Sequence, residues 1–145
     1  MTEDPGADAL DTALRTLRYR DLSAHDLRRH LEQKGFLASA CDTVLETLER
    51  TGVLDDRRFA ENRARALAGR GSGDALVRYE LERAGVAAVA IEDALGALEP
   101  EDGRARSIAD RRGPGPKTAR YLRSKGFSDE AVAKAVATVP RDALG

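Results

Sequence analysis

Apolar residues recur along the chain at the spacing of amphipathic helices, and glycines separate these helices from one another. Leu10, Leu14 and Leu17 form the first apolar stripe. Ser23 is a favourable N-cap for a second helix, which ends at Gly35, where glycine permits a left-handed turn without a Cβ clash. The sequence shows no strand-like alternation and no Asn-Gly hairpin. The pattern therefore predicts an all-α protein.

One sequence pattern occurs three times: an apolar helix that ends in glycine, followed by another apolar helix. LEQKGF, LERAGV and LRSKGF align at Gly35, Gly85 and Gly126. The apolar positions that follow then coincide in three sets: Cys41, Ile91 and Val132; Leu45, Leu95 and Val136; Leu48, Leu98 and Val139. Single units of this size bury little apolar surface, so we expect three tandem three-helix repeats stacked into an elongated, curved array.

The repeat divides the chain into five expected segments. Residues 1–8 are polar and contain Pro and Gly, which predicts a disordered N-terminal tail. Three-helix repeats are expected over 9–54, 55–100 and 101–140, the third with a short first helix because a Gly-Pro-Gly-Pro stretch must end it. Residues 141–145 are expected to form a frayed tail.

The composition narrows the class of protein. Hydrophobic residues make up 41% of the 145 residues but aromatic residues only 4%, which favours a core of Leu, Val and Ala between closely spaced helices. The single cysteine, Cys41, excludes a disulfide framework, and its alignment with Ile91 and Val132 predicts a core residue. No apolar run approaches the roughly 20 residues that span a bilayer, and the acidic N-terminus lacks the features of a signal peptide. We therefore expect a cytoplasmic protein without a membrane association.

Four segments, taken in order, resemble the RecX family, the bacterial regulatory protein of the RecA recombinase. They are SAHDLRRHLEQKGF (23–36), GVLDDRRFAENR (52–63), VRYELERAGV (77–86) and ARYLRSKGFSDEAV (119–132). Each turn motif alone is a common helix C-cap, whereas the ordered set is specific. The resemblance extends over nearly the whole chain, from about Leu10 to Val139.

The resemblance implies a function as well as a fold. A member of this family is expected to contain three tandem three-helix repeats, to catalyse no reaction and to need no cofactor. It is expected to bind the RecA filament on DNA along its helical groove and to inhibit the ATPase, strand-exchange and co-protease activities of RecA. We further expect a monomer that contacts nucleic acid weakly or through the filament.

Charge is distributed unevenly, although the net charge is only −1. Residues 104–125 contain eight basic residues and one acid, Asp110, while residues 92–102 contain five acids and no base. One-signed clusters of this kind can contact phosphates or an acidic protein surface, and the alternative is a solvated helical face. The candidate partner-binding or DNA-binding residues are Arg104, Arg106, Arg111, Arg112, Lys117, Arg120, Arg123 and Lys125, with Arg28 and Arg29 from a smaller basic cluster.

Other side chains are predicted to be structural. Asp55 and Asp56 lie at a helix start, where negative charge caps unpaired N–H groups, and this position favours capping over a metal site. His25 and His30 are five residues apart, which does not suit a shared metal on one helix face. Tyr79 and Tyr121 precede repeat glycines and are expected to pack between units rather than to stack on bases.

The sequence is less consistent with two other functions. The first is an autonomous helical DNA-binding protein that uses helix-turn-helix-like pairs at the repeat glycines. The near-neutral charge argues against it, as does the scarcity of base-reading amides, since Gln33 and Asn62 are the only ones. An enzyme is the least favoured, because the sequence has no Gly-rich phosphate loop, no GxSxG motif and no Cys/His constellation.

Overall fold

The computed structural model describes residues 5–137, and within this range the chain forms nine α-helices and no strand. The prediction of an all-α protein is therefore confirmed. The helices are α1 (Pro5–Tyr19), α2 (Ala24–Gln33), α3 (Ala38–Arg50), α4 (Asp56–Gly69), α5 (Asp74–Arg83), α6 (Ala88–Gly96), α7 (Glu101–Arg112), α8 (Pro116–Ser124) and α9 (Asp129–Val136).

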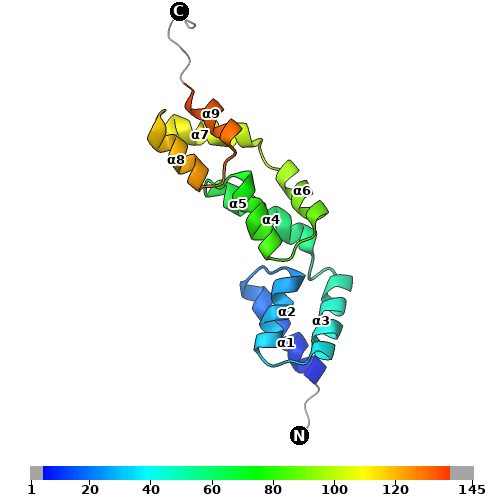
Figure 1. The fold of residues 1–145 in the computed structure, drawn as a ribbon. Coiled ribbons are helices and arrows are strands. Elements are labelled where there is room, and N and C mark those ends of the chain that lie inside the picture. Colours follow the sequence, from blue (N-terminus) through cyan, green and yellow to red (C-terminus); the bar gives the residue numbers. More distant parts are fainter. Residues whose placement is uncertain (1–4, 138–145) are drawn as a thin grey trace, which may run out of the picture.

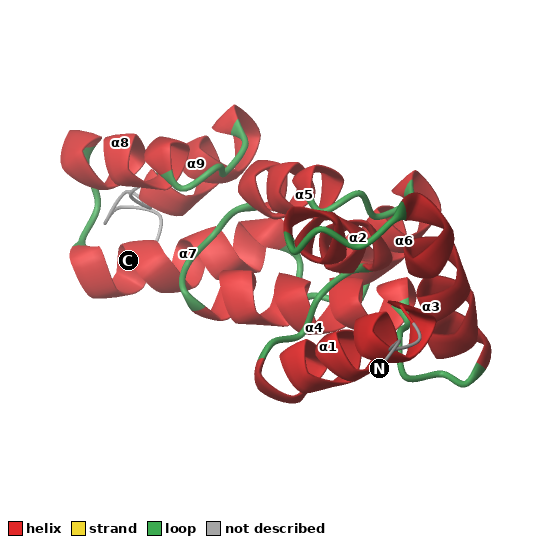
Figure 2. Ribbon diagram, turned by 90° about the horizontal axis from the view of Figure 1, so that it is seen from below, coloured by secondary structure: helices red, strands yellow, loops and turns green. Residues whose placement is uncertain are grey.

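The helices form three units that follow one another along an elongated, curved array (Figure 1). The first unit contains α1–α3, the second α4–α6 and the third α7–α9. In each unit the first helix packs against the third, and a separate apolar core fills the space between the helices. Figure 2 looks along this array from below, with α8 and α9 together at the upper left of the view and α3 at the right.

The three cores use the register that the repeat predicted. Cys41, Ile91 and Val132 are each at most 2% exposed, so Cys41 is a core residue as expected. The later positions keep the same register as far as the structure describes them: Leu45, Leu48 and Leu95 are buried, Leu98 and Val136 pack against their cores, and Val139 lies outside the described range.

Equivalent turns follow the second helix of every unit. Gly35, Gly85 and Gly126 have φ angles of 93°, 76° and 89°, in the left-handed region that glycine enters without strain. The residue after each glycine donates its N–H to the carbonyl five residues earlier, which closes the helix end. These bonds are Phe36 N to Leu31 O at 3.2 Å, Val86 N to Leu81 O at 3.1 Å and Phe127 N to Leu122 O at 3.1 Å.

The N-terminal helix begins earlier than predicted. The structure places residues 5–8 in α1, so the expectation of a disordered tail over residues 1–8 is wrong for this part. Proline is favoured at the first position of a helix, because the N–H that it lacks would have no intrahelical partner there. Asp8 in the first turn interacts favourably with the helix dipole. Residues 1–4 lie outside the described range.

The buried face of α1 also differs from the predicted leucine stripe. Ala9 and Ala13 are fully buried, whereas Leu10 and Leu17 pack only partly against the first core and Leu14 is 40% exposed. Small side chains at the contact let two helices approach closely, and α1 uses alanines on its buried face. The positions of the large apolar residues alone therefore do not define this face.

The third unit has the shortest first helix, as the repeat suggested. Helix α7 has 12 residues, against 15 in α1 and 14 in α4. It ends at Gly113, with φ of 92°, and Pro116 then begins α8 at the first helical position. The expected frayed tail over 141–145 lies outside the described residues.

Candidate functional site

Nothing in the described part of the chain suggests a metal centre or a membrane segment. Across residues 5–137, no group of three or more His, Cys, Asp or Glu side chains is placed to hold a metal ion. Within the same range, every helix is too short or too polar to cross a bilayer. The candidate residues to be placed in the structure are the arginine and lysine side chains that the sequence singled out.

The structure divides the basic segment 104–125 into a buried residue and an exposed surface. Arg104 is only 8% exposed and lies where the second and third units meet. Its guanidinium donates to the carbonyls of Glu99 and Ser72, both at 2.8 Å, and pairs with the carboxylate of Asp74. Each of these partners is internal, so Arg104 joins two units and we remove it from the candidate contact residues.

Four exposed residues form what we call the basic surface: Arg111 and Arg112 at the end of α7, and Lys117 and Arg120 on α8. A short loop joins the end of α7, which carries the first pair, to the start of α8, which carries the second. The guanidinium carbon of Arg112 lies 3.7 Å from the centre of the Tyr121 ring, so the ring holds this side chain through a cation–π contact. No ion pair within residues 5–137 involves any of these four side chains.

Three further residues of the segment have internal roles. Arg106 pairs with Asp110 at 3.7 Å, and Arg123 pairs with Asp129 at 3.4 Å. Both pairs are exposed, so they restrain the side chains only weakly. Lys125 is half-buried, and its carbonyl accepts a hydrogen bond from the second unit. These residues therefore differ from the four of the basic surface, whose side chains are exposed and form no ion pair within residues 5–137.

The smaller cluster in the first unit is also divided. Arg28 is paired with Glu32 at 3.2 Å and with Asp42. Arg29, its neighbour on α2, is exposed and forms no ion pair within the described range. Adjacent residues on a helix point in different directions, which explains why one joins helices and the other faces outward.

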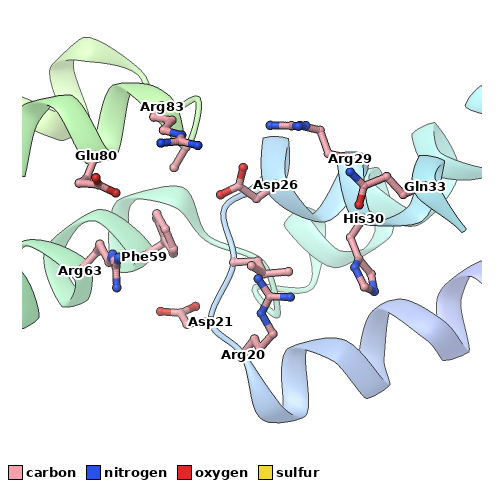
Figure 3. Close-up of a pocket in the computed structure, with 12 residues that line it drawn as sticks. Arg20, Asp21, Asp26, Arg29, His30, Gln33, Phe59, Arg63, Glu80 and Arg83 are labelled. Carbon is pink, nitrogen blue, oxygen red and sulfur yellow. The ribbon is translucent and has the colours of Figure 1, made fainter.

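Arg29 lines a cleft of about 560 Å³ between the first and second units. Figure 3 shows side chains from α2, from the loop after α1, and from α4 and α5 around this space. Its charged residues are arginines 20, 29, 63 and 83 and the acids Asp21, Asp26 and Glu80. None of the four guanidinium groups forms an ion pair with another residue between 5 and 137.

Sequence reasoning identified only one of the four arginines in the cleft. Arg20, Arg63 and Arg83 lie in separate parts of the chain, in the loop after α1, within α4 and at the end of α5. Their proximity depends on the packing of the first unit against the second. The cluster is therefore not visible in the sequence, where its members are far apart, and it forms only in the folded protein.

The tyrosines only partly follow the prediction that they pack between units. Tyr121 is half-buried and packs against the third core beneath Arg112. Tyr79 is 54% exposed, so the prediction is wrong for this residue. It lies on the exposed face of α5, whereas Val77 and Leu81 of the same helix lie on the buried face.

Two family models match the chain. Residues 9–48 match the model described as the first three-helix domain of RecX, and residues 55–95 match that of the second three-helix domain. The regulatory protein RecX of Vibrio vulnificus is 31% identical over 139 residues, which cover 88% of this chain and 90% of that protein. That of Halorhodospira halophila is 32% identical over 142 residues, which cover 91% and 88%.

Solved structures show the same fold. The crystal structure of RecX from Lactobacillus salivarius superimposes with a TM-score of 0.79 at 18% sequence identity, covering 92% of this chain and 95% of the other. A second crystal structure, of a regulatory protein RecX, has a TM-score of 0.76 at 21% identity and covers 91% and 71%. Each alignment covers more than nine tenths of this chain.

Proposed function

This chain belongs to the RecX family, and from that premise we propose that it binds the RecA recombinase filament on DNA and inhibits its ATPase, strand-exchange and co-protease activities. The family membership is the observation that carries the proposal. The regulatory role follows from the family, whose members named above are regulatory proteins. The filament as target and inhibition as outcome are the steps that we propose.

The shape of the molecule supports a filament as the target. Three small units in a row give a long surface for a chain of this size (Figure 1). A repeat array of this kind can contact several subunits of a polymer at once, and linked contacts raise the overall affinity beyond that of any single one. A groove binder that bridges subunits would resist the rearrangements that ATP hydrolysis requires.

The distribution of free positive charge supports two contact regions. The basic surface lies on the third unit, and the cleft with its four arginines lies between the first and second units. A guanidinium group that pairs with no carboxylate among residues 5–137 is suited to bind a carboxylate or a phosphate of a partner, because it can bind either group in a bidentate manner. We propose that both regions face the filament, where DNA phosphates and acidic side chains are present together.

The same structure argues against an autonomous DNA-binding protein. In a helix-turn-helix pair the helix after the turn would enter the major groove, and here these helices are α3, α6 and α9. Their exposed residues include several carboxylates, which repel a phosphate backbone. These acids are Asp42 and Glu46 on α3, Glu92 and Asp93 on α6, and Asp129 and Glu130 on α9.

ATP hydrolysis by RecA on single-stranded DNA tests the proposal directly. We expect the protein to lower the steady-state rate at a substoichiometric ratio to RecA, because one bound array affects several subunits. A rate that is unchanged at equimolar protein would contradict inhibition. Binding to naked duplex DNA serves as the second measurement, and we expect it to be weak and to fall steeply with salt. Sequence-dependent nanomolar binding at 150 mM salt would instead favour the DNA-binding alternative.

A further inference from the structure

The two junctions between units are built on the same edge of the repeat. At the first junction the hydroxyl of Ser23 donates to the carbonyl of Ala84 at 2.6 Å. At the second, the N–H of Gly73 donates to the carbonyl of Lys125 at 2.7 Å. Both donors are N-cap residues of a second helix, and both acceptors immediately precede a repeat glycine. At each junction, therefore, the start of the second helix in one unit contacts the turn after the second helix in the next unit.

Both of these turns are closed against the neighbouring unit. A Cβ atom added at Gly85 would lie 2.5 Å from the Cβ of His25, and one added at Gly126 would lie 2.7 Å from the Cβ of Leu76. These distances are well below van der Waals contact, so only glycine lets the two backbones approach this closely. The apolar residue after each glycine is correspondingly buried, with Val86 6% and Phe127 5% exposed.

The first unit has the same turn, and within the described part of the chain nothing covers it. We call residues Lys34, Gly35, Phe36 and Leu37 the first-unit turn. Gly35 has the same left-handed backbone, yet a Cβ there would meet no atom within 4 Å. Phe36 is only half-buried, unlike Val86 and Phe127. No hydrogen bond from residues 5–137 reaches the carbonyl of Lys34, the position at which Ala84 and Lys125 are acceptors.

An apolar surface continues from this turn. Leu37 is 69% exposed, although leucine is usually buried. It borders a groove of about 620 Å³ between α1 and α3, which Leu10, Ala40 and Val44 also line. A partner on the first-unit turn would thus bury leucine and phenylalanine surface in addition to satisfying a backbone carbonyl.

We propose that the first-unit turn is a docking site for the N-terminal turn of a helix in the RecA filament, with a small N-cap residue such as Ser or Gly. The internal junctions identify this occupant, because the two covered copies of the edge each hold a helix start of that kind. The inference rests on the proposed function, which supplies the partner. It adds a third contact region, at the end of the array opposite the basic surface (Figure 1).

A second copy of the chain fits this edge less well. The second helix of the third unit begins at Pro116, which has no N–H to donate. At the two internal junctions the equivalent residues, Ala24 and Asp74, donate this N–H to the carboxylates of Asp56 and Glu101. End-to-end stacking would therefore lack a bond that both internal junctions contain.

The test compares the effect of the same substitution at two exposed apolar residues of this protein. Leu37→Glu places a charge in the proposed contact, and Val89→Glu places the same charge on α6 at a residue that is 68% exposed. We expect Leu37→Glu to weaken binding to RecA filaments about tenfold, or ~1.4 kcal/mol, and Val89→Glu less than twofold. Circular dichroism should be unchanged for both. Hydrogen exchange of the amides of residues 34–37 should slow when filaments are added to the parent protein.

The outcomes separate the two proposals. Parent protein that binds filaments, together with equal binding by Leu37→Glu and unchanged exchange at 34–37, would overturn the docking site and leave the proposed function intact. Parent protein that fails to bind would overturn both. A concentration-dependent dimer in sedimentation velocity that Leu37→Glu abolishes would assign the edge to a second copy and overturn the filament as its occupant.

Discussion

The carboxylate of Asp56 caps a helix in a different unit from its own. It accepts a 2.8 Å hydrogen bond from the N–H of Ala24, the first residue of α2, while the adjacent Asp55 caps α4 itself through the N–H groups of Arg57 and Arg58. Glu101 repeats the arrangement at the next junction, accepting from the N–H of Asp74 at 2.7 Å. The two acids that the sequence marked as helix caps thus have separate roles, one within a unit and one between units.

We expect Asp56→Ala to loosen the first junction. The change leaves the N–H of Ala24 without its partner, and loss of a capping side chain costs about 0.5–2 kcal/mol. Urea unfolding followed by circular dichroism measures the loss. Asp55→Ala serves as a matched control for α4, and hydrogen exchange distinguishes the two: the amide of Ala24 should exchange faster in Asp56→Ala only. Protection of Ala24 that is the same in both variants would contradict the assignment.

The repeat glycines should differ in their sensitivity to substitution. Gly35→Ala adds only the cost of a left-handed alanine, about 1 kcal/mol. Gly85→Ala adds the same cost and also forces the new Cβ against His25, and overpacking of this kind costs a further ~1–3 kcal/mol. Thermal unfolding of the two variants should therefore show a clearly lower Tm for Gly85→Ala. Equal melting temperatures would mean that the first junction yields without cost.

Arg104→Met should destabilise the second junction. The substitution fills a similar volume but leaves the carbonyls of Ser72 and Glu99 and the carboxylate of Asp74 without their donor. Removing one partner of a buried charged network costs about 3–5 kcal/mol. Arg106→Met, at an exposed residue of the same helix, should change stability by less than about 0.5 kcal/mol. Chemical denaturation that gives similar values for both variants would show that the Arg104 network does not hold the units together.

Charge reversal on the basic surface should weaken inhibition of RecA. Lys117→Glu with Arg120→Glu changes two exposed side chains that have no ion pair among residues 5–137. We expect at least a tenfold higher protein concentration for half-maximal inhibition of ATP hydrolysis, with an unchanged circular dichroism spectrum. Arg15→Glu with Arg18→Glu makes the same charge change on the exposed face of α1 and should have a much smaller effect. Similar losses in both double variants would show that net charge, rather than this surface, is responsible.

The ion pair between Arg78 and Glu92 should be visible in a pH titration. The Arg78 side chain donates to the two oxygens of Glu92 at 2.9 and 3.3 Å, and this hydrogen bonding lowers the pKa of the Glu92 carboxyl. A carboxyl whose pKa is lower in the folded state contributes stability above its unfolded pKa, and this contribution is lost as the pH falls through the folded pKa. NMR titration should show Glu92 ionised at lower pH in the parent protein than in Arg78→Gln. The difference should shrink in high salt, because the pair is exposed.

The sequence predicted much of the fold because the signals were local. Glycine in a left-handed turn and apolar residues at helical spacing depend on backbone conformation and on one helix face, so the matched positions Cys41, Ile91 and Val132 could be read in advance. The predicted apolar stripe of α1 was incomplete: Leu10 and Leu17 pack partly against the core and Leu14 is exposed, while the buried face uses Ala9 and Ala13, which carry little hydrophobic signal of their own.

The candidate sites depended far more on contacts between units. The basic run of 104–125 was visible in the sequence, yet nothing in it distinguished the buried Arg104 from the exposed Arg111, because burial was decided by Ser72 and Asp74 some thirty residues earlier. The four arginines of the cleft come from separate helices and loops, and only the packing of α2 near α5 brings them together.

The sequence by itself determined the all-α repeat and its register, because helix ends, helix faces and turn glycines are encoded within about ten residues of one another. Only the tertiary structure decided which charges are free and which copy of the repeated edge is uncovered. Those properties arise where residues far apart in the chain meet: the equivalent turns at Gly35 and Gly85 are both left-handed, but only Gly85 has a neighbouring unit packed against it.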